Sequence, residues 1–347
     1  MNFKFSFLDL FNRFSDDMGI DLGTANTLVH VKNKGIVIRE PSVVAIEINT
    51  NEVLAIGAEA KRMLGRAPSN IMPVRPMRDG IISEYETAQA MLKYFIKRAM
   101  RKNTLIRPRV LVGVPSGVTE VQKRAVIDAA LEAGAREAYL IEEPMAAAIG
   151  AGLPVQDAWG NVIVDIGGGT CEVAVISLGG IVEKASVHAG GDALDKAIQL
   201  FIRKKYDVLI GERTAEEVKI EVGDAMYNED PLTMEICGRD LRTGLPKNII
   251  VTSNDVCEAI EEPVRVIMNA VTSTLEKTPP ELAADIMNNG IIMTGGTSLL
   301  RNLDRFISSA TKIPVFVSED ALSCVAIGTG IAVENIDTYR KGFLIES

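Results

Sequence analysis

The sequence is poor in the residues from which many metal and redox sites are built. It has two histidines, one tryptophan and four cysteines, and no two cysteines form a CxxC pair. Zinc sites need clustered Cys and His ligands, and disulfide frameworks need closely spaced cysteines. Neither is expected. We expect free, buried thiols in a reducing cytoplasm at Cys171, Cys237, Cys257 and Cys324.

Positive charge and long apolar runs are also scarce. Lys and Arg total 37 against 46 Asp and Glu, a net charge of −9, and no basic cluster could neutralise a row of phosphates. We therefore expect no nucleic-acid partner. No apolar run approaches the roughly 20 residues of a membrane-spanning helix, and the first residues lack the apolar core and cleavage site of a signal peptide. We expect a cytoplasmic protein.

The common phosphate-binding motifs are absent as well. The sequence has no G-x-x-x-x-G-K-[ST] segment, which excludes a P-loop. The glycines Gly328 and Gly330 lack the third glycine and the preceding strand of a dinucleotide fingerprint, which disfavours a dehydrogenase.

What the sequence does contain is an internal repeat. Residues 19–29 (GIDLGTANTLV) are echoed by residues 162–175 (VIVDIGGGTCEVAV). Each segment is typical of a strand, an Asp, a glycine turn with Thr, and a second strand with period-two alternation. The length of 347 residues and the 47% hydrophobic content suit two lobes with a core each. A duplicated unit is therefore predicted.

Strands and helices alternate around these hairpins. Helical periodicity covers residues 86–102 and 118–133, and buried strands are predicted at 109–114 and 291–294. A capping box starting at Thr214 predicts the beginning of another helix. This alternation indicates an α/β fold with mixed sheets.

The glycine turns suit phosphate binding. Glycine reaches backbone angles that let several N–H groups point toward one anion, and an Asp before each turn could hold the water shell of Mg²⁺. Either turn alone could equally be an ordinary hairpin with a structural Asp, but the matched pair with Asp21 and Asp165 favours a triphosphate site. Neither turn contains Lys, which suits slow hydrolysis better than fast phosphoryl transfer.

Six segments together resemble the MreB family of bacterial actins: residues 21–26 (DLGTAN), 75–80 (RPMRDG), 114–117 (VPSG), 142–148 (EEPMAAA), 165–170 (DIGGGT) and 278–282 (TPPEL). The similarity runs from about residue 19 to residue 342. The two turns alone mark only the wider actin, Hsp70 and sugar-kinase superfamily, whereas RPMRDG and EPMAAA are specific to this branch. The resemblance implies an actin-like two-lobe fold that binds ATP and Mg²⁺ in a cleft.

The resemblance also assigns site residues. Glu143 matches the catalytic acid that orients or deprotonates the attacking water, Thr170 and Asp165 assist, and Asp21 and Asp165 organise the Mg²⁺ waters. The residues implied to contact the nucleotide are Asp21, Gly23, Thr24, Ala25, Asn26, Gly167, Gly168, Gly169, Thr170, Gly191, Glu216, Glu217, Lys219, Gly295, Gly296, Thr297 and Ser298.

Two of these assignments have alternatives. From spacing alone, Glu216 and Lys219 read as a solvated ion pair on one helix face. Relatives usually carry three glycines and Ala where this chain has residues 295–298 (GGTS), so the β-branched Thr297 makes the fit of the base less certain than that of the phosphates.

The domain limits follow the repeat. The first lobe is expected at 17–160 plus 330–347, with a small insertion near 40–80, and the second lobe at 161–329, with an insertion near 190–250.

Two apolar features could reach a membrane. Residues 1–16 form a candidate amphipathic helix with Phe7, Leu8, Phe11 and Phe14 on one stripe, although such a helix could equally dock on the protein itself. Leu105 and Ile106, flanked by arginines, occupy the position of a loop that dips into the membrane in relatives.

The resemblance implies a slow ATPase that forms filaments at the inner face of the cell membrane and organises cell-wall elongation proteins, and thereby cell shape. An actin-superfamily small-molecule kinase is the main alternative, because it would share both phosphate turns. An Hsp70-type chaperone would need a peptide-binding region, for which we expect no room before Ser347.

Overall fold

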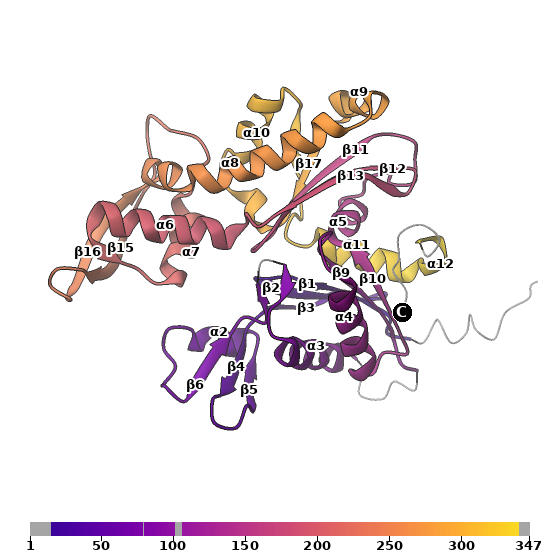
Figure 1. The fold of residues 1–347 in the computed structure, drawn as a ribbon, viewed down its shortest axis with the longest axis horizontal. Helices are drawn as coiled ribbons and strands as arrows, with labels where there is room; N and C mark the ends of the chain where they lie inside the picture. Colours follow the sequence, from indigo (N-terminus) through magenta and orange to yellow (C-terminus); the bar gives the residue numbers. More distant parts are fainter. Residues whose placement is uncertain (1–14, 79, 101–105, 340–347) are drawn as a thin grey trace, which may run out of the picture. The chain divides into compact units, whose positions relative to one another are not determined.

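The computed structural model describes residues 15–78, 80–100 and 106–339, which fold into two compact units (Figure 1). Unit 1 contains the residues up to Leu153 together with those from Ser323 onward, and unit 2 contains Pro154–Leu322. The candidate membrane residues Phe7, Leu8, Phe11, Phe14 and Leu105 lie outside the described residues.

Unit 1 is built on a five-stranded sheet in the order β10-β9-β1-β2-β3. Its strands are β1 (Met18–Leu22), β2 (Asn26–Val31), β3 (Gly35–Pro41), β9 (Arg109–Val114) and β10 (Glu137–Glu142). β10, β9 and β1 run parallel, and β1, β2 and β3 form an antiparallel meander. β9 is buried along its whole length because helices cover both faces of the sheet (Figure 1).

The helices of unit 1 are α3 (Tyr85–Ala99) and α4 (Glu120–Glu132) on one face and α5 (Glu143–Gly150) and α11 (Cys324–Glu334) on the other, followed by α12 (Ile336–Tyr339) (Figure 1). A smaller layer consists of β4 (Val44–Glu47), β5 (Val53–Ile56), α2 (Ala58–Met63) and β6 (Ile71–Val74). A short ribbon pairs β7 (Met77–Arg78) with β8 (Ile81–Ile82).

Unit 2 repeats this topology. Its sheet has the order β13-β12-β11-β17-β18, formed by β11 (Asn161–Ile166), β12 (Cys171–Ser177), β13 (Gly180–Val187), β17 (Ile291–Thr294) and β18 (Val315–Val317). β18, β17 and β11 are parallel, and β11, β12 and β13 are antiparallel, as in unit 1. The predicted duplication is therefore confirmed strand by strand.

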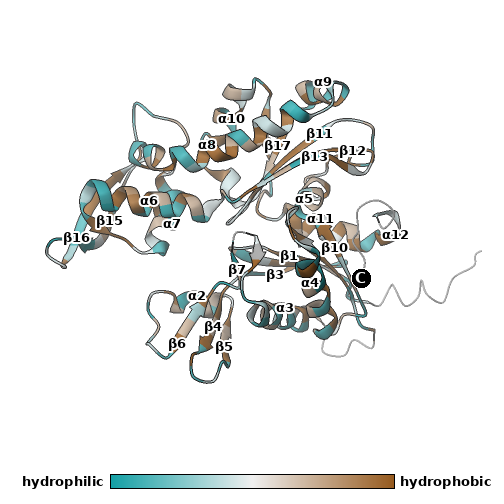
Figure 2. Ribbon diagram, in the orientation of Figure 1, coloured by the Kyte–Doolittle hydropathy of each residue, from teal (hydrophilic) through white to brown (hydrophobic). Residues whose placement is uncertain are grey.

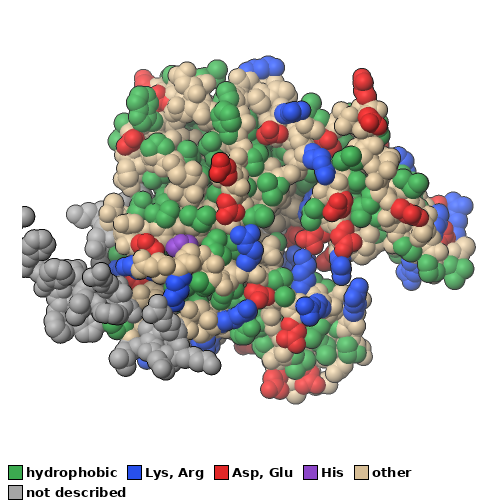
Figure 3. Space-filling view, turned by 180° about the vertical axis from the view of Figure 1, so that it is seen from behind, with side chains coloured by type: hydrophobic (Ala, Val, Ile, Leu, Met, Phe, Trp, Pro, Cys, Tyr) green, Lys and Arg blue, Asp and Glu red, His purple; other side chains and the backbone are tan. Residues whose placement is uncertain are grey.

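The helices of unit 2 are α6 (Gly191–Tyr206), α7 (Glu212–Val222), α8 (Ser253–Lys277), α9 (Pro280–Asn289) and α10 (Leu303–Thr311), with a 3₁₀ turn η1 (Gly296–Leu299). A second small sheet joins β14 (Val208–Leu209), β15 (Thr233–Asp240) and β16 (Pro246–Thr252). Figure 2 shows apolar residues concentrated on β11 and on α11. On the face shown in Figure 3, acidic and basic side chains are interspersed.

Local signals account for several element boundaries. Thr119 with Gln122, and Thr252 with Asp255, form capping boxes at the starts of α4 and α8. The capping box expected at Thr214 is wrong, because α7 already begins at Glu212 with Gly211 as its N-cap. An acidic residue is favoured in the first turn of a helix, and Glu212 takes this place in α7.

The cysteine expectation holds in part. All four thiols are free, and Cys171 and Cys324 are buried, but Cys257 is half-buried and Cys237 is exposed. Cys237 lies on β15 of the small sheet, which has one face in solvent. Among the described residues, no helix is both long enough and apolar enough to cross a bilayer.

Candidate functional site

In unit 1 the candidate residues gather where the parallel strands end. Asp21 is paired with Gly113 of β9, and Glu142 is paired with Val114, so all lie at the carboxyl edge of the sheet. This edge is where α/β sheets bind ligands. The turn after β1 contains Gly23, Thr24 and Ala25 and leads into β2 at Asn26.

The first turn is held from behind by Ser42, a buried residue that the sequence reasoning missed. The Ser42 hydroxyl donates to the carbonyl oxygen of Gly23 (2.6 Å), and the Ser42 N–H donates to the carbonyl oxygen of Ala25 (3.0 Å). Because a trans peptide is planar, holding the Gly23 carbonyl toward Ser42 turns the N–H of Thr24 the other way. The Thr24 hydroxyl, also buried, accepts a bond from the N–H of Gly80 (3.2 Å).

Glu143 is the first residue of α5 and is buried. Because α5 begins at this residue, the Glu143 carboxylate lies in the first turn of the helix. A side chain added at Gly113 would lie 3.6 Å from the Cγ atom of Glu143. Glu143 therefore lies over β9 beside the residue that pairs with Asp21, at a helix end that favours negative charge.

In unit 2 the second turn joins β11 to β12 and has a corresponding arrangement. The carbonyl oxygens of Gly167 and Gly168 accept bonds from the N–H groups of Gly191 (3.0 Å) and Asp192 (2.8 Å) at the start of α6. The planar peptides then direct the N–H groups of Gly168 and Gly169 away from α6. Within the described residues these two N–H groups have no protein acceptor. A row of such N–H groups is what an anion needs.

The glycines of this region differ in what a side chain would meet. A Cβ at Gly190 would lie 2.6 Å from the carbonyl oxygen of Gly168, and one at Gly191 would lie 3.0 Å from Lys219 Nζ. At Gly167, by contrast, the nearest atom would be the Thr170 carbonyl oxygen at 3.7 Å, and no left-handed backbone angle demands glycine. The protein itself therefore leaves space at Gly167.

Asp165 is the second candidate for organising Mg²⁺. Its side chain is buried, and its Oδ1 accepts a bond from the Thr294 hydroxyl (2.7 Å) on the neighbouring strand β17. Burial, together with the nearby charge of Glu172, raises the pKa of Asp165 to about 6. A cation beside Asp165 would favour its ionised form and so lower this pKa. Because a carboxylate oxygen is the donor that Mg²⁺ prefers, the residue fits the ion.

The described residues contain no cluster of three or more acidic, His or Cys side chains that could cage a metal directly.

The loop expected to contact the base lies against the second turn. Gly295 has φ +83°, and a Cβ there would lie 2.3 Å from the carbonyl oxygen of Ile166, so only glycine fits. The Thr297 hydroxyl donates to the carbonyl oxygen of Gly167 (2.8 Å), and the Ser298 hydroxyl donates to that of Gly295 (2.6 Å). Gly296 begins η1 between them.

Lys219, one of the residues implied to contact the nucleotide, has partners on α6. Its Nζ lies 2.9 Å from Asp195 and donates to the carbonyl oxygen of Gly191 (3.2 Å). Burial raises the pKa of Asp195 to about 6, against the opposing effect of Lys219. Glu217 pairs with Arg213 on the solvent side of α7 (2.8 Å).

The structure thus brings the predicted residues together within each unit. Unit 1 gathers Asp21, the first turn and Glu143, and unit 2 gathers Asp165, the second turn, Gly191, Lys219 and residues 295–298. Ile106, the one candidate membrane residue that the structure describes, is half-buried.

Known proteins share this arrangement. A family model described as MreB/Mbl protein matches residues 15–341. The chain belongs to the MreB/Mbl family. The cell shape-determining protein MreB of Escherichia coli K12 is 52% identical over 332 residues, which cover 94% of this chain and 95% of that protein. The cell shape-determining protein Mbl of Bacillus subtilis is 48% identical, with 94% and 98% covered.

Solved structures agree with the MreB/Mbl assignment. MreB5 of Spiroplasma citri bound to AMPPNP has a TM-score of 0.88 at 38% identity, covering 93% of this chain and 97% of that one. A chain of the MamK double helical filament has a TM-score of 0.79 at 22% identity, covering 91% and 98%, and so shares the fold. The predicted actin-like fold is therefore confirmed.

Replacing Asp165 by a neutral residue tests whether its buried carboxylate destabilises the folded protein. Because the folded protein holds the Asp165 proton more tightly than the unfolded chain does, stability falls as the pH rises from the ordinary value of 3.8 through about 6, and the full cost of ionisation is present above that. We expect Asp165→Asn to raise the free energy of unfolding of the nucleotide-free protein at pH 8 by about 1–3 kcal/mol, and by less at pH 5. Denaturant unfolding at both pH values measures this.

Asp157→Asn, at an exposed aspartate of the same unit, is the control and should change stability little. Equal or lower stability of Asp165→Asn at pH 8 would contradict this account of Asp165.

Proposed function

We propose that this chain binds Mg-ATP through its two glycine turns, hydrolyses it slowly and assembles with further copies of itself into filaments. The observation that carries the nucleotide site is the space at Gly167, in a turn whose carbonyl oxygens are bonded to α6. The S. citri relative bound to AMPPNP and another structure of MreB5 bound to ADP support the choice of nucleotide.

Each residue has a distinct part in the proposed reaction. N–H groups of the turns bind phosphate oxygens, and Glu143 orients or deprotonates the attacking water, with Thr170 assisting. Asp21 and Asp165 would hold Mg²⁺ through its water shell, and the bound ion would supply positive charge beside the phosphates. The turn residues include no Lys to stabilise the departing charge, so hydrolysis is slow.

Filling the space at Gly167 tests the site. Since a Cβ at Gly167 would meet no protein atom closer than 3.7 Å, we expect Gly167→Val to fold with an unchanged melting temperature but to bind Mg-ATP at least about tenfold more weakly. Fluorescence titration with an ATP analogue measures the affinity.

The matched control is Gly180→Val, in β13 of the same sheet, where a Cβ would also meet only ordinary contacts. It should bind Mg-ATP as the parent does. Parent-like affinity of Gly167→Val would move the nucleotide site elsewhere.

The cell-level role is proposed from the relatives. Curated proteins about 50% identical to this chain are named cell shape-determining. We propose that its filaments guide the cell-wall elongation machinery, with hydrolysis acting as a timer of filament lifetime.

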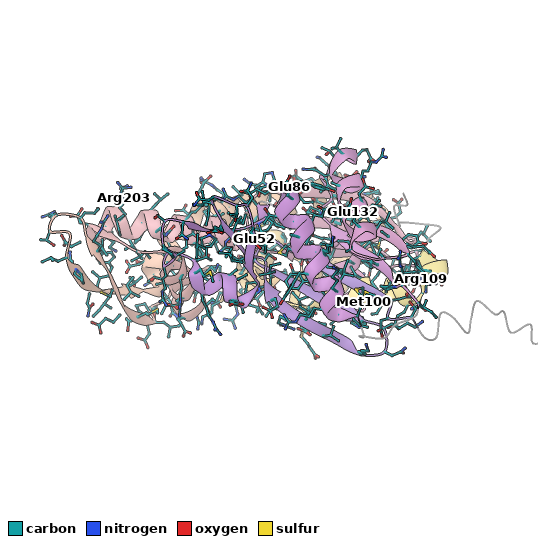
Figure 4. All side chains as sticks on the ribbon, turned by 90° about the horizontal axis from the view of Figure 1, so that it is seen from below. Glu52, Glu86, Met100, Arg109, Glu132 and Arg203 are labelled. Carbon is teal, nitrogen blue, oxygen red and sulfur yellow. The ribbon has the colours of Figure 1, made fainter. Side chains whose placement is uncertain are left out.

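We also propose that the filaments lie on the inner face of the cell membrane. The two apolar segments join the fold at one place, since Met18 of β1 pairs with Val110 of β9. The Asp17 carboxylate accepts bonds from the N–H of Arg109 (2.8 Å) and from its guanidinium (2.7 Å and 2.9 Å). Figure 4 shows Met100 and Arg109 at the opposite end of α3 from Glu86. The described residues next to the two segments therefore lie at the same end of unit 1.

A filament would multiply a weak membrane contact, because every subunit presents the same two segments. Co-sedimentation with anionic liposomes is expected to require ATP. Leu105→Ser combined with Ile106→Ser, or deletion of residues 1–15, should each weaken it several-fold. If both variants bind liposomes as the parent does, the membrane proposal is wrong.

A further inference from the structure

The hydroxyl of Thr297 joins two segments that are far apart in the sequence. It donates to the carbonyl oxygen of Gly167 (2.8 Å), which also accepts the N–H of Gly191 (3.0 Å). Thr297 is buried, and a Cβ at Gly191 would lie 3.1 Å from its Oγ1. The Gly167 carbonyl is thus held by a helix N-terminus and by a side chain of the loop beyond β17.

The orientation of that carbonyl decides what the turn offers to a phosphate. The carbonyl of Gly167 and the N–H of Gly168 belong to one planar trans peptide and point in opposite directions. A peptide between two glycines rotates easily, since neither residue has a Cβ to restrict it. Rotation would turn a carbonyl oxygen toward the anion and remove an N–H donor.

We propose that Thr297 is a positioning residue of the nucleotide site, which fixes the Gly167–Gly168 peptide so that the Gly168 N–H faces the bound phosphate. The inference rests on the proposed nucleotide-binding function. It also gives Thr297 a role on the phosphate side, in place of the base-side contact implied by resemblance. The loop of residues 295–298 then supports the second turn in addition to any contact with the base.

Two substitutions separate the hydroxyl from the shape of the side chain. Thr297→Val keeps the branched shape and removes the hydroxyl, and Thr297→Ser keeps the hydroxyl. Dissociation constants are measured for Mg-ATP and for adenosine, which lacks phosphates, by competition with a fluorescent ATP analogue. We expect Thr297→Val to weaken Mg-ATP binding about three- to tenfold, to leave adenosine binding within about twofold, and Thr297→Ser to bind both as the parent does.

Other outcomes overturn the inference. Equal weakening of Mg-ATP and adenosine by Thr297→Val would make Thr297 a base-side contact, and unchanged Mg-ATP affinity would make its hydroxyl irrelevant to binding. If Thr297→Val does not fold, Thr297→Ala is compared with Thr297→Ser in the same way. A parent protein that binds no Mg-ATP would overturn the proposed function and this inference with it, whereas a binding parent with an unaffected Thr297→Val overturns the inference alone.

Discussion

Replacing Gly328 by alanine is expected to destabilise unit 1 by about 3 kcal/mol or more. α11 and α5 cross with their backbones in contact, so a Cβ at Gly328 would lie 1.8 Å from the carbonyl oxygen of Ala146. The reciprocal position behaves alike, since a Cβ at Gly150 would lie 1.9 Å from the carbonyl oxygen of Cys324. Backbone atoms inside two packed helices cannot move aside as a flexible side chain could.

Two opposing contributions decide whether Gly328→Ala raises or lowers the stability of unit 1. Alanine is favoured over glycine in a helix by about 1 kcal/mol, which is smaller than the cost of separating the helices. Chemical denaturation of the nucleotide-free protein measures the difference, and Gly117→Ala, where a Cβ meets nothing within 4 Å, is the control. Parent-like stability of Gly328→Ala would show that α5 and α11 can separate freely. Because α5 begins with Glu143, such freedom would also undermine the positioning of the candidate catalytic acid.

Glu143→Ala is expected to slow phosphate release from ATP about 100-fold or more, while Mg-ATP affinity stays within about threefold of the parent. The substitution removes the group assigned to the attacking water and no assigned phosphate contact. Single-turnover phosphate release measures the first quantity and fluorescence titration the second.

The neighbouring carboxylate supplies the control for that experiment. Glu142 is the N-cap residue of α5, and Glu142→Ala should hydrolyse ATP at a rate close to that of the parent. Loss of ATP binding in Glu143→Ala, with or without loss of hydrolysis, would make Glu143 a structural acid at a helix terminus.

Much of the fold could be predicted because its signals are local. The strand predicted at 109–114 is β9 as observed, since an uninterrupted apolar run is typical of a strand buried on both faces. The duplication was visible because both hairpins place an Asp one residue before the end of a buried strand. Each of these patterns lies within one short segment of the sequence.

The residues whose hydroxyl groups hold the two turns could not be predicted from local patterns. Ser42 holds a turn 19 residues earlier in the chain, and Thr297 holds one 130 residues earlier. The bond between Thr294 and Asp165 likewise depends on β17 lying beside β11. Periodicity reports which side of an element is buried, and it carries no information on which distant carbonyl a hydroxyl meets. Asp195 was not foreseen as the partner of Lys219 for the same reason, because it lies on another helix.

We propose that this chain is a filament protein of the MreB/Mbl family whose assembly depends on nucleotide. High-speed sedimentation of the purified full chain with Mg-ATP, with Mg-ADP and without nucleotide tests this proposal. We predict that the chain enters the pellet with Mg-ATP and stays in the supernatant without nucleotide, and that Gly167→Val stays in the supernatant throughout. Sedimentation that is the same with and without Mg-ATP would contradict nucleotide-dependent assembly.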